Sequence, residues 1–406
     1  MADAPSPLSG RMPILVLNAI SAGGLSRLPA ERYRVGKDVV DPVGVLVRSA
    51  DMHNRPIAAS VRAIGRAGAG TNNIPVALMS ARGVPVFNAP GANANAVKEL
   101  VLAGLLMAAR NLAPALRFVS ELDVSAPDLD KVVEDSKKHF GGYELQGQTL
   151  GIVGLGKIGC MVAEAAIGLG LNVLGYDPEI TVDAAWSLPS QVRRAASVNE
   201  VLKGAQFVTL HVPLVEATRH LVNEGNIGLM RPGAVLLNFS RDGVVSNAAV
   251  LEALGADKLS TYVCDFPSAE LLQQPRSLQS RIVALPHLGA STREAEDNCA
   301  VMVVDQLRAY LEQGEISNAV NFPTVRMVRE SPWRVAIANS NVPNMLGQMS
   351  TTMAQAGLNI HNMVNKSRGE MAYTLVDVDS AVSAQVLDAL AAIPGVLAVR
   401  YLPEPR

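Results

Sequence analysis

The chain has 406 residues, enough for two or three domains, because a single hydrophobic core stops growing at roughly 250–300 residues. Its 35 Lys and Arg residues nearly balance its 37 Asp and Glu residues, which argues against DNA, RNA or an anionic membrane as the main partner. The longest fully apolar run, residues 100–109, is far shorter than the ~20 residues that span a bilayer. A small-molecule partner is therefore favoured, with no nucleic acid and no membrane.

The three cysteines, Cys160, Cys264 and Cys299, are widely spaced and odd in number. This pattern suits neither a disulfide framework nor a zinc site, so we expect reduced, buried thiols and no metal. The N-terminus has no basic segment followed by an apolar one, and we therefore expect an unexported, cytoplasmic protein.

The first half of the chain alternates short β-branched runs with helical patterns. Strands are predicted at residues 13–18, 43–49 and 84–90, and a long helix at residues 96–116. From Thr149 the alternation is clearer, with apolar strands separated by helical segments; these strands lie at residues 149–156, 172–177, 207–213, 234–240, 260–266 and 281–287. The pattern predicts an α/β fold with parallel sheets covered by helices on both faces.

A second long helix is predicted at residues 293–315, followed by a Pro-containing connector. Beyond the connector the rhythm changes to strand, helix, strand, strand, helix, strand. This order predicts a ferredoxin-like βαββαβ domain.

The sequence "GIVGLGKIG" places Gly154, Gly156 and Gly159 in the G-x-G-x-x-G spacing of a dinucleotide-binding turn. It follows an apolar strand and opens a helix, and Asp177 comes 23 residues after Gly154, at the end of the next strand. In such a turn the glycines let the backbone approach a pyrophosphate at the helix N-terminus. A carboxylate at Asp177 would accept the ribose hydroxyls and repel a 2′-phosphate, which favours NAD over NADP. The alternative interpretation of Asp177 is a turn residue that starts "DPEI".

Of the six histidines, only His211 and His287 end predicted sheet strands, where ligands gather in open α/β sheets. Hydride transfer from an alcohol needs a base, a cation for the substrate carboxylate, and a carboxylate beside the base. Arg241 follows one strand, and Asp265 and Glu270 follow the next. Taken singly, these residues also suit a structural histidine, a surface arginine and loop acids; their shared position after successive strands favours one cleft.

The run "IVALPHLGASTREA" resembles the histidine signature of the D-isomer-specific 2-hydroxyacid dehydrogenases, and is most similar to the phosphoglycerate dehydrogenases among them. The resemblance extends over nearly the whole chain through "VRS", "GRAGAGTNNI", "HVP", "NFSRDG" and "DFPSAE". It implies that His287 is the acid–base, that Glu270 hydrogen-bonds it and raises its pKa, and that Arg241 binds the carboxylate and carbonyl. Asp265 matches the acid that contacts the nicotinamide amide.

The resemblance also implies two sets of contacts. The NAD contacts are Gly154, Gly156, Lys157, Ile158, Gly159, Asp177, His211, Pro213, Asp265 and Gly289. The substrate contacts are Arg48, Ser49, Gly68 and Asn93. For a substrate phosphate, Arg48 is the best candidate; Arg66 and Lys98 are weaker ones, more simply interpreted as solvated surface charges.

The implied organisation has three domains and a homo-oligomer, a dimer or a tetramer. A discontinuous substrate domain comprises residues 1–95 and 291–322, an inserted Rossmann-like NAD domain comprises residues 96–290, and an ACT-like regulatory domain comprises residues 331–406. The two long helices are the expected hinge connections, and closure would exclude water from the hydride path. Candidate effector contacts are Asn339, Asn341 and Asn359, but Asn339 and Asn344 replace a His and a Gly of the serine-binding motif, so the amino-acid effector stays open.

The implied activity is NAD-dependent oxidation of D-3-phosphoglycerate to 3-phosphohydroxypyruvate in serine biosynthesis. Two alternatives remain. One is the same chemistry on an unphosphorylated 2-hydroxy acid. The other is a non-enzymatic NAD-sensing protein, against which the complete set of Arg241, Glu270 and His287 argues.

Overall fold

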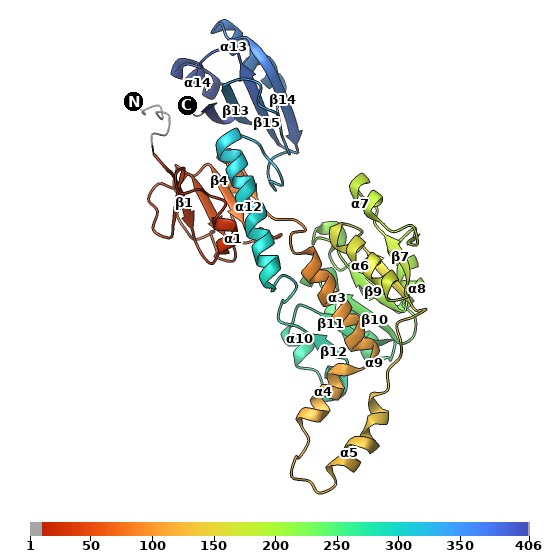
Figure 1. Ribbon diagram of the computed structural model, residues 1–406. Helices are drawn as coiled ribbons and strands as arrows, with labels where there is room; N and C mark the ends of the chain where they lie inside the picture. Colours follow the sequence, from red (N-terminus) through yellow and green to blue (C-terminus); the bar gives the residue numbers. More distant parts are fainter. Residues whose placement is uncertain (1–9, 405–406) are drawn as a thin grey trace. The chain divides into compact units, whose positions relative to one another are not determined.

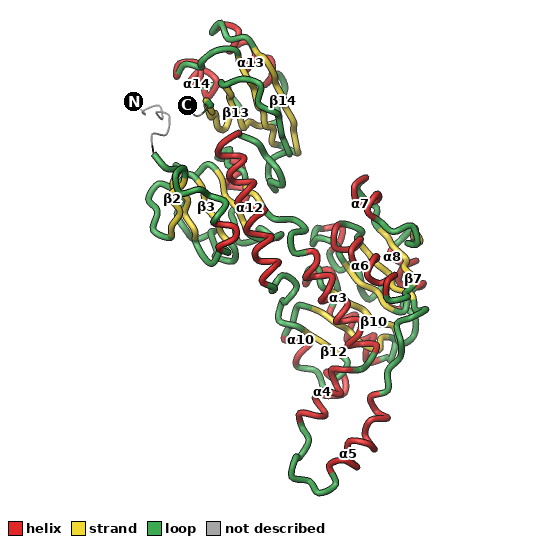
Figure 2. Tube along the Cα trace, viewed as in Figure 1, coloured by secondary structure: helices red, strands yellow, loops and turns green. Residues whose placement is uncertain are grey.

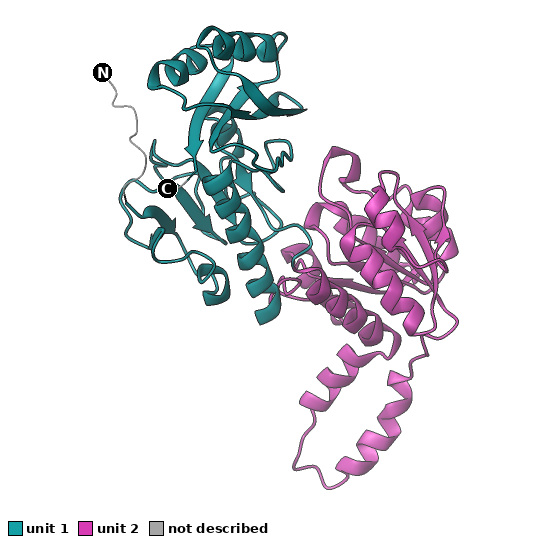
Figure 3. Cartoon of the chain, turned by 45° about the horizontal axis from the view of Figure 1, so that its top comes forward, with its two compact units in different colours: residues 1–92, 293–406 teal, residues 93–292 magenta. Residues whose placement is uncertain are grey.

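The computed structural model describes residues 10–404 and divides them into two compact units, formed by residues 1–92 with 293–406 and by residues 93–292 (Figure 3). The first nine residues, on which the expectation about export depends, lie outside the described part. The predicted domain boundaries near residues 95 and 291 lie a few residues from the breaks between the two units, which come after Ala92 and before Arg293. Each unit is described separately below.

Unit 1 begins with a five-stranded parallel sheet in the order β2-β1-β3-β4-β5. Its strands are β1 (Met12–Val16), β2 (Tyr33–Gly36), β3 (Gly44–Val47), β4 (Ala63–Arg66) and β5 (Val86–Phe87), and its helices are α1 (Ala22–Leu25), α2 (Val76–Ala81) and α12 (Arg293–Gln313). Every residue of β3 is buried, as expected for a parallel strand with helices on both faces. On one face Leu46 packs with α12, and on the other Val45 and Val47 pack near Met79 of α2.

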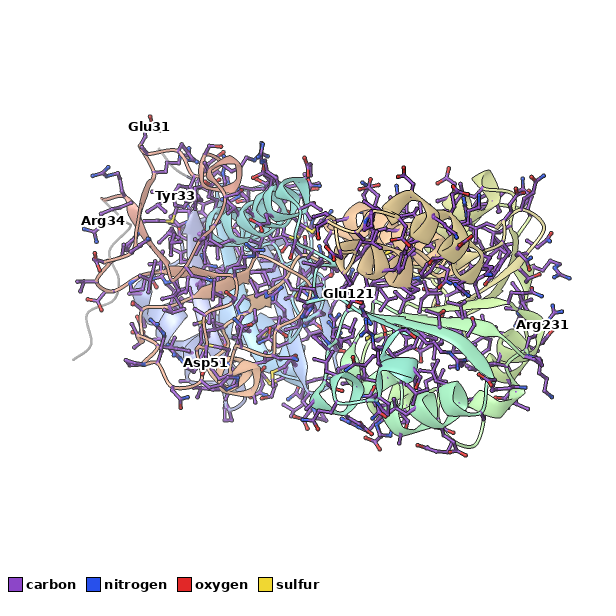
Figure 4. The ribbon with its side chains drawn as sticks, turned by 90° about the horizontal axis from the view of Figure 1, so that it is seen from below. Glu31, Tyr33, Arg34, Asp51, Glu121 and Arg231 are labelled. Carbon is purple, nitrogen blue, oxygen red and sulfur yellow. The ribbon has the colours of Figure 1, made fainter. Side chains whose placement is uncertain are left out.

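The 21-residue helix α12 crosses this sheet closely (Figure 1). A Cβ added to Gly65 would lie 2.9 Å from Val303, and one added to Gly44 would lie 3.2 Å from Leu307. The hydroxyl of Tyr33 donates a hydrogen bond to Glu312 near the end of the helix, at 2.8 Å. Tyr33 is buried, while Glu31 and Arg34 on either side of it lie at the surface (Figure 4).

Unit 2 contains a seven-stranded parallel sheet in the order β12-β11-β10-β9-β6-β7-β8. The strands are β6 (Thr149–Val153), β7 (Asn172–Tyr176), β8 (Arg193–Arg194), β9 (Phe207–Leu210), β10 (Ala234–Asn238), β11 (Leu259–Cys264) and β12 (Ile282–Ala284). The helices are α3 (Ala94–Ala109), α4 (Leu112–Ser120), α5 (Leu129–Ser136), α6 (Lys157–Gly168), α7 (Val182–Ser187), α8 (Val198–Gly204), α9 (Asn247–Gly255), α10 (Ala269–Leu272) and α11 (Arg276–Gln279). The strand order reverses between β6 and β9, which is where doubly wound sheets bind ligands.

The single helix predicted over residues 96–116 is two helices, α3 and α4, bent by 73°. Asn111 between them has a left-handed backbone with φ of 52°. Pro114 explains the break, because proline inside a continuous helix lacks a donor and clashes with the preceding turn, whereas the first turn of a new helix accepts it. No single helix among the described residues is long and apolar enough to cross a membrane; only this bent pair passes that test, by length and composition alone.

Helices α4 and α5 extend from the body of unit 2 as a hairpin arm (Figure 2). None of their residues is buried. Leu116 and Val119 on α4 and Val124 in the connecting loop are exposed by 65%, 60% and 86%. The arm therefore presents apolar side chains without a partner in the described chain.

The C-terminal segment of unit 1 has the predicted βαββαβ order: β13 (Trp333–Ser340), α13 (Met345–Gln355), β14 (Ile360–Arg368), β15 (Met371–Val378), α14 (Ala384–Ala391) and β16 (Val396–Pro403). Its antiparallel sheet has the strand order β14-β15-β13-β16. Val335 and Ile337 on one face pack with Met349 of α13 and Leu390 of α14.

The other face of this sheet is not open. Tyr373 and Leu375 share a buried cluster with Phe87, with Tyr310 of α12 and with Phe322 of the connector. The predicted third domain therefore belongs to the same compact unit as the first sheet. The physical reason is that the connector supplies buried apolar side chains to this cluster and does not act as a free linker.

Candidate active site

The glycine turn between β6 and α6 has the geometry that its spacing predicts. Gly154 has φ of +93°, which favours glycine, and a Cβ on Gly159 would lie 2.0 Å from the Gly154 carbonyl oxygen. Gly156 is the N-cap of α6, and a Cβ there would have nothing within 4 Å. With Lys157 and Ile158, these glycines form a helix start that a pyrophosphate can approach closely, so the chain fits a dinucleotide.

Asp177 follows β7 and points its carboxylate at this turn. One oxygen accepts a hydrogen bond from the Leu155 N–H at 2.8 Å, and the other accepts from the Glu179 N–H at 2.9 Å. The second bond is the turn role that the sequence left open. The first places the carboxylate beside the glycine turn, where a ribose contact requires it; that contact stays a prediction.

His211 follows β9 and lies directly beside the turn. Its carbonyl oxygen is 2.5 Å from a Cβ placed on Gly154, and its ring Nε2 lies 3.1 Å from Oγ1 of Thr209. Burial lowers the pKa of His211 to about 4. The His211 ring is turned toward Thr209, whereas the His287 ring is exposed and can reach a substrate hydroxyl, so His287 is the better candidate. Pro213 lies two residues further on in the same loop.

Arg241 lies at the carboxyl end of β10 in a turn that Asn238 organises. The Asn238 side chain donates to the Arg241 carbonyl at 2.9 Å and accepts from the N–H and hydroxyl of Ser240. The Arg241 guanidinium donates to the Ser240 carbonyl, and burial lowers its pKa. No carboxylate pairs with it within residues 10–404. A half-buried cation without an anionic partner suits a substrate carboxylate.

Asp265, after β11, holds the loop that carries His287. Its two carboxylate oxygens accept the N–H groups of Leu288 and Gly289, both at 2.7 Å, and its carbonyl accepts the His287 N–H. Burial raises the pKa of Asp265, and the bonds from Leu288 and Gly289 oppose that rise. In this structure the carboxylate is thus a loop-positioning group, and its contact with the nicotinamide amide stays a prediction.

His287 is exposed and has a left-handed backbone with φ of 58°. Its ring lies edge-on to Phe266, with 5.2 Å between ring centroids. Glu270 is exposed on α10, and its carboxylate makes no hydrogen bond to His287. Since catalytic hydrogen bonds often form only in the substrate complex, the predicted Glu270–His287 pair stays a prediction.

In unit 1 two asparagines hold the segment that contains Arg48 and Ser49. The side chain of Asn18, just after β1, accepts the Arg48 N–H at 2.8 Å and donates to the Ser49 hydroxyl at 2.9 Å. The side chain of Asn73 donates to the carbonyl of Ala50 at 2.8 Å. Sequence reasoning missed both asparagines; the signal was present at Asn18, the polar last residue of a predicted strand.

Arg66 ends β4, the strand beside β3, and it is half-buried, which differs from the surface charge expected for it. Its Nη1 would lie 1.6 Å from a Cβ on Gly68, so its guanidinium fills the space that this glycine leaves. Burial raises the pKa of the Cys299 thiol, and the positive charges of Arg66 and Arg48 oppose that rise. The charges of both guanidiniums therefore act on one buried thiol.

Two other substrate candidates lie in unit 2. Asn93 precedes α3 as its N-cap, without a side-chain capping bond. Lys98 on α3 donates to the side chain of Asn95. Neither residue lies in the unit that contains Arg48.

The three effector candidates do not meet within one C-terminal sheet. Asn339 is buried and Asn341 is exposed, near the end of β13 where Ser340 pairs with Met371. Asn359 precedes β14, whose first residue Ile360 pairs with Val378 at the opposite end of the sheet. Asn344, in the place of a motif glycine, has the left-handed φ of 65° that asparagine tolerates.

Comparison with known proteins agrees with this geometry. Residues 102–289 match the family described as D-isomer specific 2-hydroxyacid dehydrogenase, NAD binding domain. The chain is 32% identical to D-3-phosphoglycerate dehydrogenase of Escherichia coli over 348 residues, which cover 84% of this chain and 81% of the relative. The chain belongs to the D-isomer-specific 2-hydroxyacid dehydrogenase family. The predicted resemblance and the predicted cofactor, NAD, are thereby confirmed.

A second member of the family is D-3-phosphoglycerate dehydrogenase of Methanocaldococcus jannaschii, which is 35% identical over 285 residues. The match covers 69% of this chain but only 52% of that relative, so the chain spans about half of its length. The NAD+-bound 3-phosphoglycerate dehydrogenase of Entamoeba histolytica superposes with a TM-score of 0.59 at 23% identity, over 77% of this chain and 99% of that one. This last comparison supports the fold alone.

Proposed function

We propose that this chain oxidises D-3-phosphoglycerate with NAD to 3-phosphohydroxypyruvate, the first step of phosphorylated serine biosynthesis. The observation that carries the proposal is the pair of arginines at the ends of neighbouring strands, Arg48 directly after β3 and Arg66 as the last residue of β4. A phosphate needs about two cationic or N–H donors in fixed geometry, and these two arginines are the candidates for that role. The names of the relatives from Escherichia coli and Methanocaldococcus jannaschii support the same substrate.

In this proposal His287 takes the proton of the substrate hydroxyl and Arg241 holds the carboxylate and the developing carbonyl. NAD, when bound, accepts the hydride. Glu270 stabilises the protonated His287, and Asp265 keeps the histidine loop in place through the Leu288 and Gly289 N–H groups. The family relationship and the exposed position of His287 support these roles.

The test is NADH oxidation with 3-phosphohydroxypyruvate, compared with 2-oxo acids that lack the phosphate, each with and without serine. We expect kcat/KM to be highest for the phosphorylated acid. Arg48→Ala should lower that value by about ten- to hundredfold, since a charge-assisted hydrogen bond is lost, and should change the value for unphosphorylated acids little. Equal activity on both classes of acid would overturn the assignment of substrate.

One observation favours the alternative, an unphosphorylated 2-hydroxy acid. The Arg48 guanidinium is already paired with Glu296, at 2.6 Å, which lowers the positive charge available to a phosphate. The same assay separates the two substrates.

We further propose that the C-terminal segment is an ACT-like regulatory domain that binds a small amino acid, and that the chain acts as a homo-oligomer in the cytoplasm. The βαββαβ order supports the first proposal. The exposed apolar arm supports oligomerisation, and the three free, buried cysteines support a reducing compartment. Because Asn339 and Asn359 lie at opposite ends of the sheet, a site that uses both requires two copies of the segment.

A further inference from the structure

The salt bridge between Arg48 and Glu296 is the feature of unit 1 that the proposed reaction does not use. Nη2 of Arg48 donates to Oε1 of Glu296 at 2.6 Å, a short charge-assisted hydrogen bond. It is the one hydrogen bond that the Arg48 side chain makes within residues 10–404. Both side chains are partly exposed, by 33% and 42%, so a dissolved anion can reach the pair.

The fold fixes Glu296 at this place. It lies in the first turn of α12, and Cys299 and Val303 follow it at intervals of three and four residues along one helix face. Val303 packs against Gly65 of β4, and Cys299 lies near Arg48 and Arg66. Glu296 therefore lies on the same face of α12 as Cys299 and Val303, the face that covers the sheet, near the ends of β3 and β4.

Three charges consequently act on one buried thiol. The charges of Arg66 and Arg48 lower the pKa of Cys299, and that of Glu296 raises it. The carboxylate cancels one of the two positive charges that a phosphate would otherwise meet. A phosphate dianion bound there also experiences repulsion from Glu296, because charges a few ångströms apart in a partly exposed site are only partly screened.

We propose that Glu296 is an internal competitor of the substrate phosphate for Arg48 and so determines how well this enzyme distinguishes phosphorylated from unphosphorylated 2-hydroxy acids. This inference rests on the proposed function. The phosphate displaces the carboxylate from Arg48 when the substrate binds, and the carboxylate takes its place again when the product leaves. Glu296 acts through Arg48 and is a specificity-determining residue without a part in the chemistry.

The test compares Glu296→Gln with a matched control, Glu294→Gln. Glu294 lies in the same first turn of α12 but is exposed and pairs with no basic group in the described chain. Both variants remove one negative charge from the helix N-terminus, so both lose the same interaction with the helix dipole. Only Glu296→Gln removes the carboxylate from Arg48.

We expect Glu296→Gln to lower KM for the phosphorylated substrate by about three- to tenfold at low salt, with kcat changed less than twofold. KM for an unphosphorylated acid should stay the same, and the gain should shrink at high ionic strength. Glu294→Gln should behave as the wild type. An unchanged or raised KM in Glu296→Gln overturns the inference, since it would make Glu296 a support for Arg48.

A binding measurement separates this inference from the proposed function. Calorimetric titration with inorganic phosphate should give tighter binding to Glu296→Gln than to the wild type or to Glu294→Gln, whatever substrate is turned over. If the three proteins differ in phosphate affinity as expected but the wild type does not turn over 3-phosphohydroxypyruvate, only the proposed function is overturned. Equal phosphate affinity in all three proteins overturns the inference.

Discussion

The guanidinium of Arg400 lies over the ring of Tyr310, 4.4 Å from its centroid, and donates a hydrogen bond to the Tyr310 carbonyl at 3.0 Å. A second bond reaches the Leu311 carbonyl at 2.9 Å. Arg334 donates to the Gln313 carbonyl. Two cations of the C-terminal sheet therefore cap the carboxyl end of α12, where unpaired carbonyls and the helix dipole favour positive charge.

Removal of the Arg400 cap should destabilise unit 1. We expect Arg400→Met to lower the free energy of unfolding by about 2–4 kcal/mol, because two buried carbonyls lose their donor and the cation–π contact is lost. Arg34→Met is the control, since Arg34 is exposed on β2 (Figure 4) and its side chain makes no hydrogen bond or salt bridge within residues 10–404. The fluorescence of Trp333 during urea unfolding, in a Trp186→Phe background, reports on this unit alone. Equal midpoints for the two variants would contradict the capping role.

The buried pair of Arg334 and Asp377 should depend strongly on both partners. Their side chains are 1% and 0% exposed and share two bonds, of 2.7 and 2.9 Å. Asp377→Asn should cost about 3–5 kcal/mol, because it leaves a buried guanidinium without its counter-charge. The double variant Arg334→Met with Asp377→Leu should recover part of this loss, because it removes both charges but leaves the Gln313 carbonyl and the Glu330 N–H without these partners. A double variant as unstable as the single one would show that the charges themselves hold the sheet together.

The glycine turn gives a prediction with a control on the same helix. Gly159→Ala places a methyl group 2.0 Å from the Gly154 carbonyl, so the turn must shift and NAD affinity should fall at least tenfold. Gly168→Ala, at the other end of α6, meets nothing within 4 Å and should leave NAD affinity unchanged. Fluorescence titration with NADH measures both. Wild-type affinity in Gly159→Ala would remove this turn from the cofactor site.

Asp177→Ala should relax the preference for NAD. The change removes the predicted ribose acceptor and the bond to the Leu155 N–H, so we expect kcat/KM for NAD to fall about ten- to hundredfold while that for NADP falls less. Glu179→Ala is the control, because this acid is exposed two residues further along. If the ratio of the two efficiencies does not change, Asp177 acts only as a turn residue.

His211 gives a prediction about pH. Its folded pKa of about 4 lies below the unfolded value of roughly 6.5, so the unfolded chain binds the proton more tightly. The stability that His211 contributes is fully present above pH 6.5 and is lost as the pH falls toward 4, by about 3 kcal/mol in total. His211→Asn should reduce the loss of stability between pH 7 and pH 4.5, measured by urea unfolding. His139→Asn, at an exposed position, should leave the pH profile as it is in the wild type.

The sequence predicts six of the seven strands in the larger sheet, because a parallel strand buried on both faces is a continuous apolar run, as in β10. It misses the edge strand β8, whose two arginines are exposed. The sequence predicts the ends of helices less well, because one or two residues decide where a helix breaks. The segment over residues 96–116 keeps apolar residues on both sides of Arg110 and Asn111, and only these two polar residues and Pro114 signal the break. The connector was expected to separate two domains, but the burial of Phe322 and Val325 depends on a sheet that follows later in the chain.

In the candidate site, too, the sequence predicts residues with a local backbone role and misses residues whose role depends on contacts between distant parts of the chain. The glycine turn follows from spacing, because each glycine has a local backbone reason to be there. The positioning roles of Asn18, Asn73 and Asn238 depend on contacts made in three dimensions, and such asparagines are common in any loop. The pair of Arg48 and Glu296 joins residues 248 positions apart, which no local pattern reveals.

The aromatic cluster of Phe87, Tyr310, Phe322 and Tyr373 has a practical consequence for anyone who wishes to isolate the catalytic part of this enzyme. A protease cut near residue 330 would leave the two fragments associated, because separating them would bring these rings into water. A gene truncated at the same point would produce a fragment that folds poorly and aggregates, because its part of the aromatic cluster would be exposed to water. Cleavage of the chain near residue 330 would for this reason not by itself release the C-terminal segment from the first sheet.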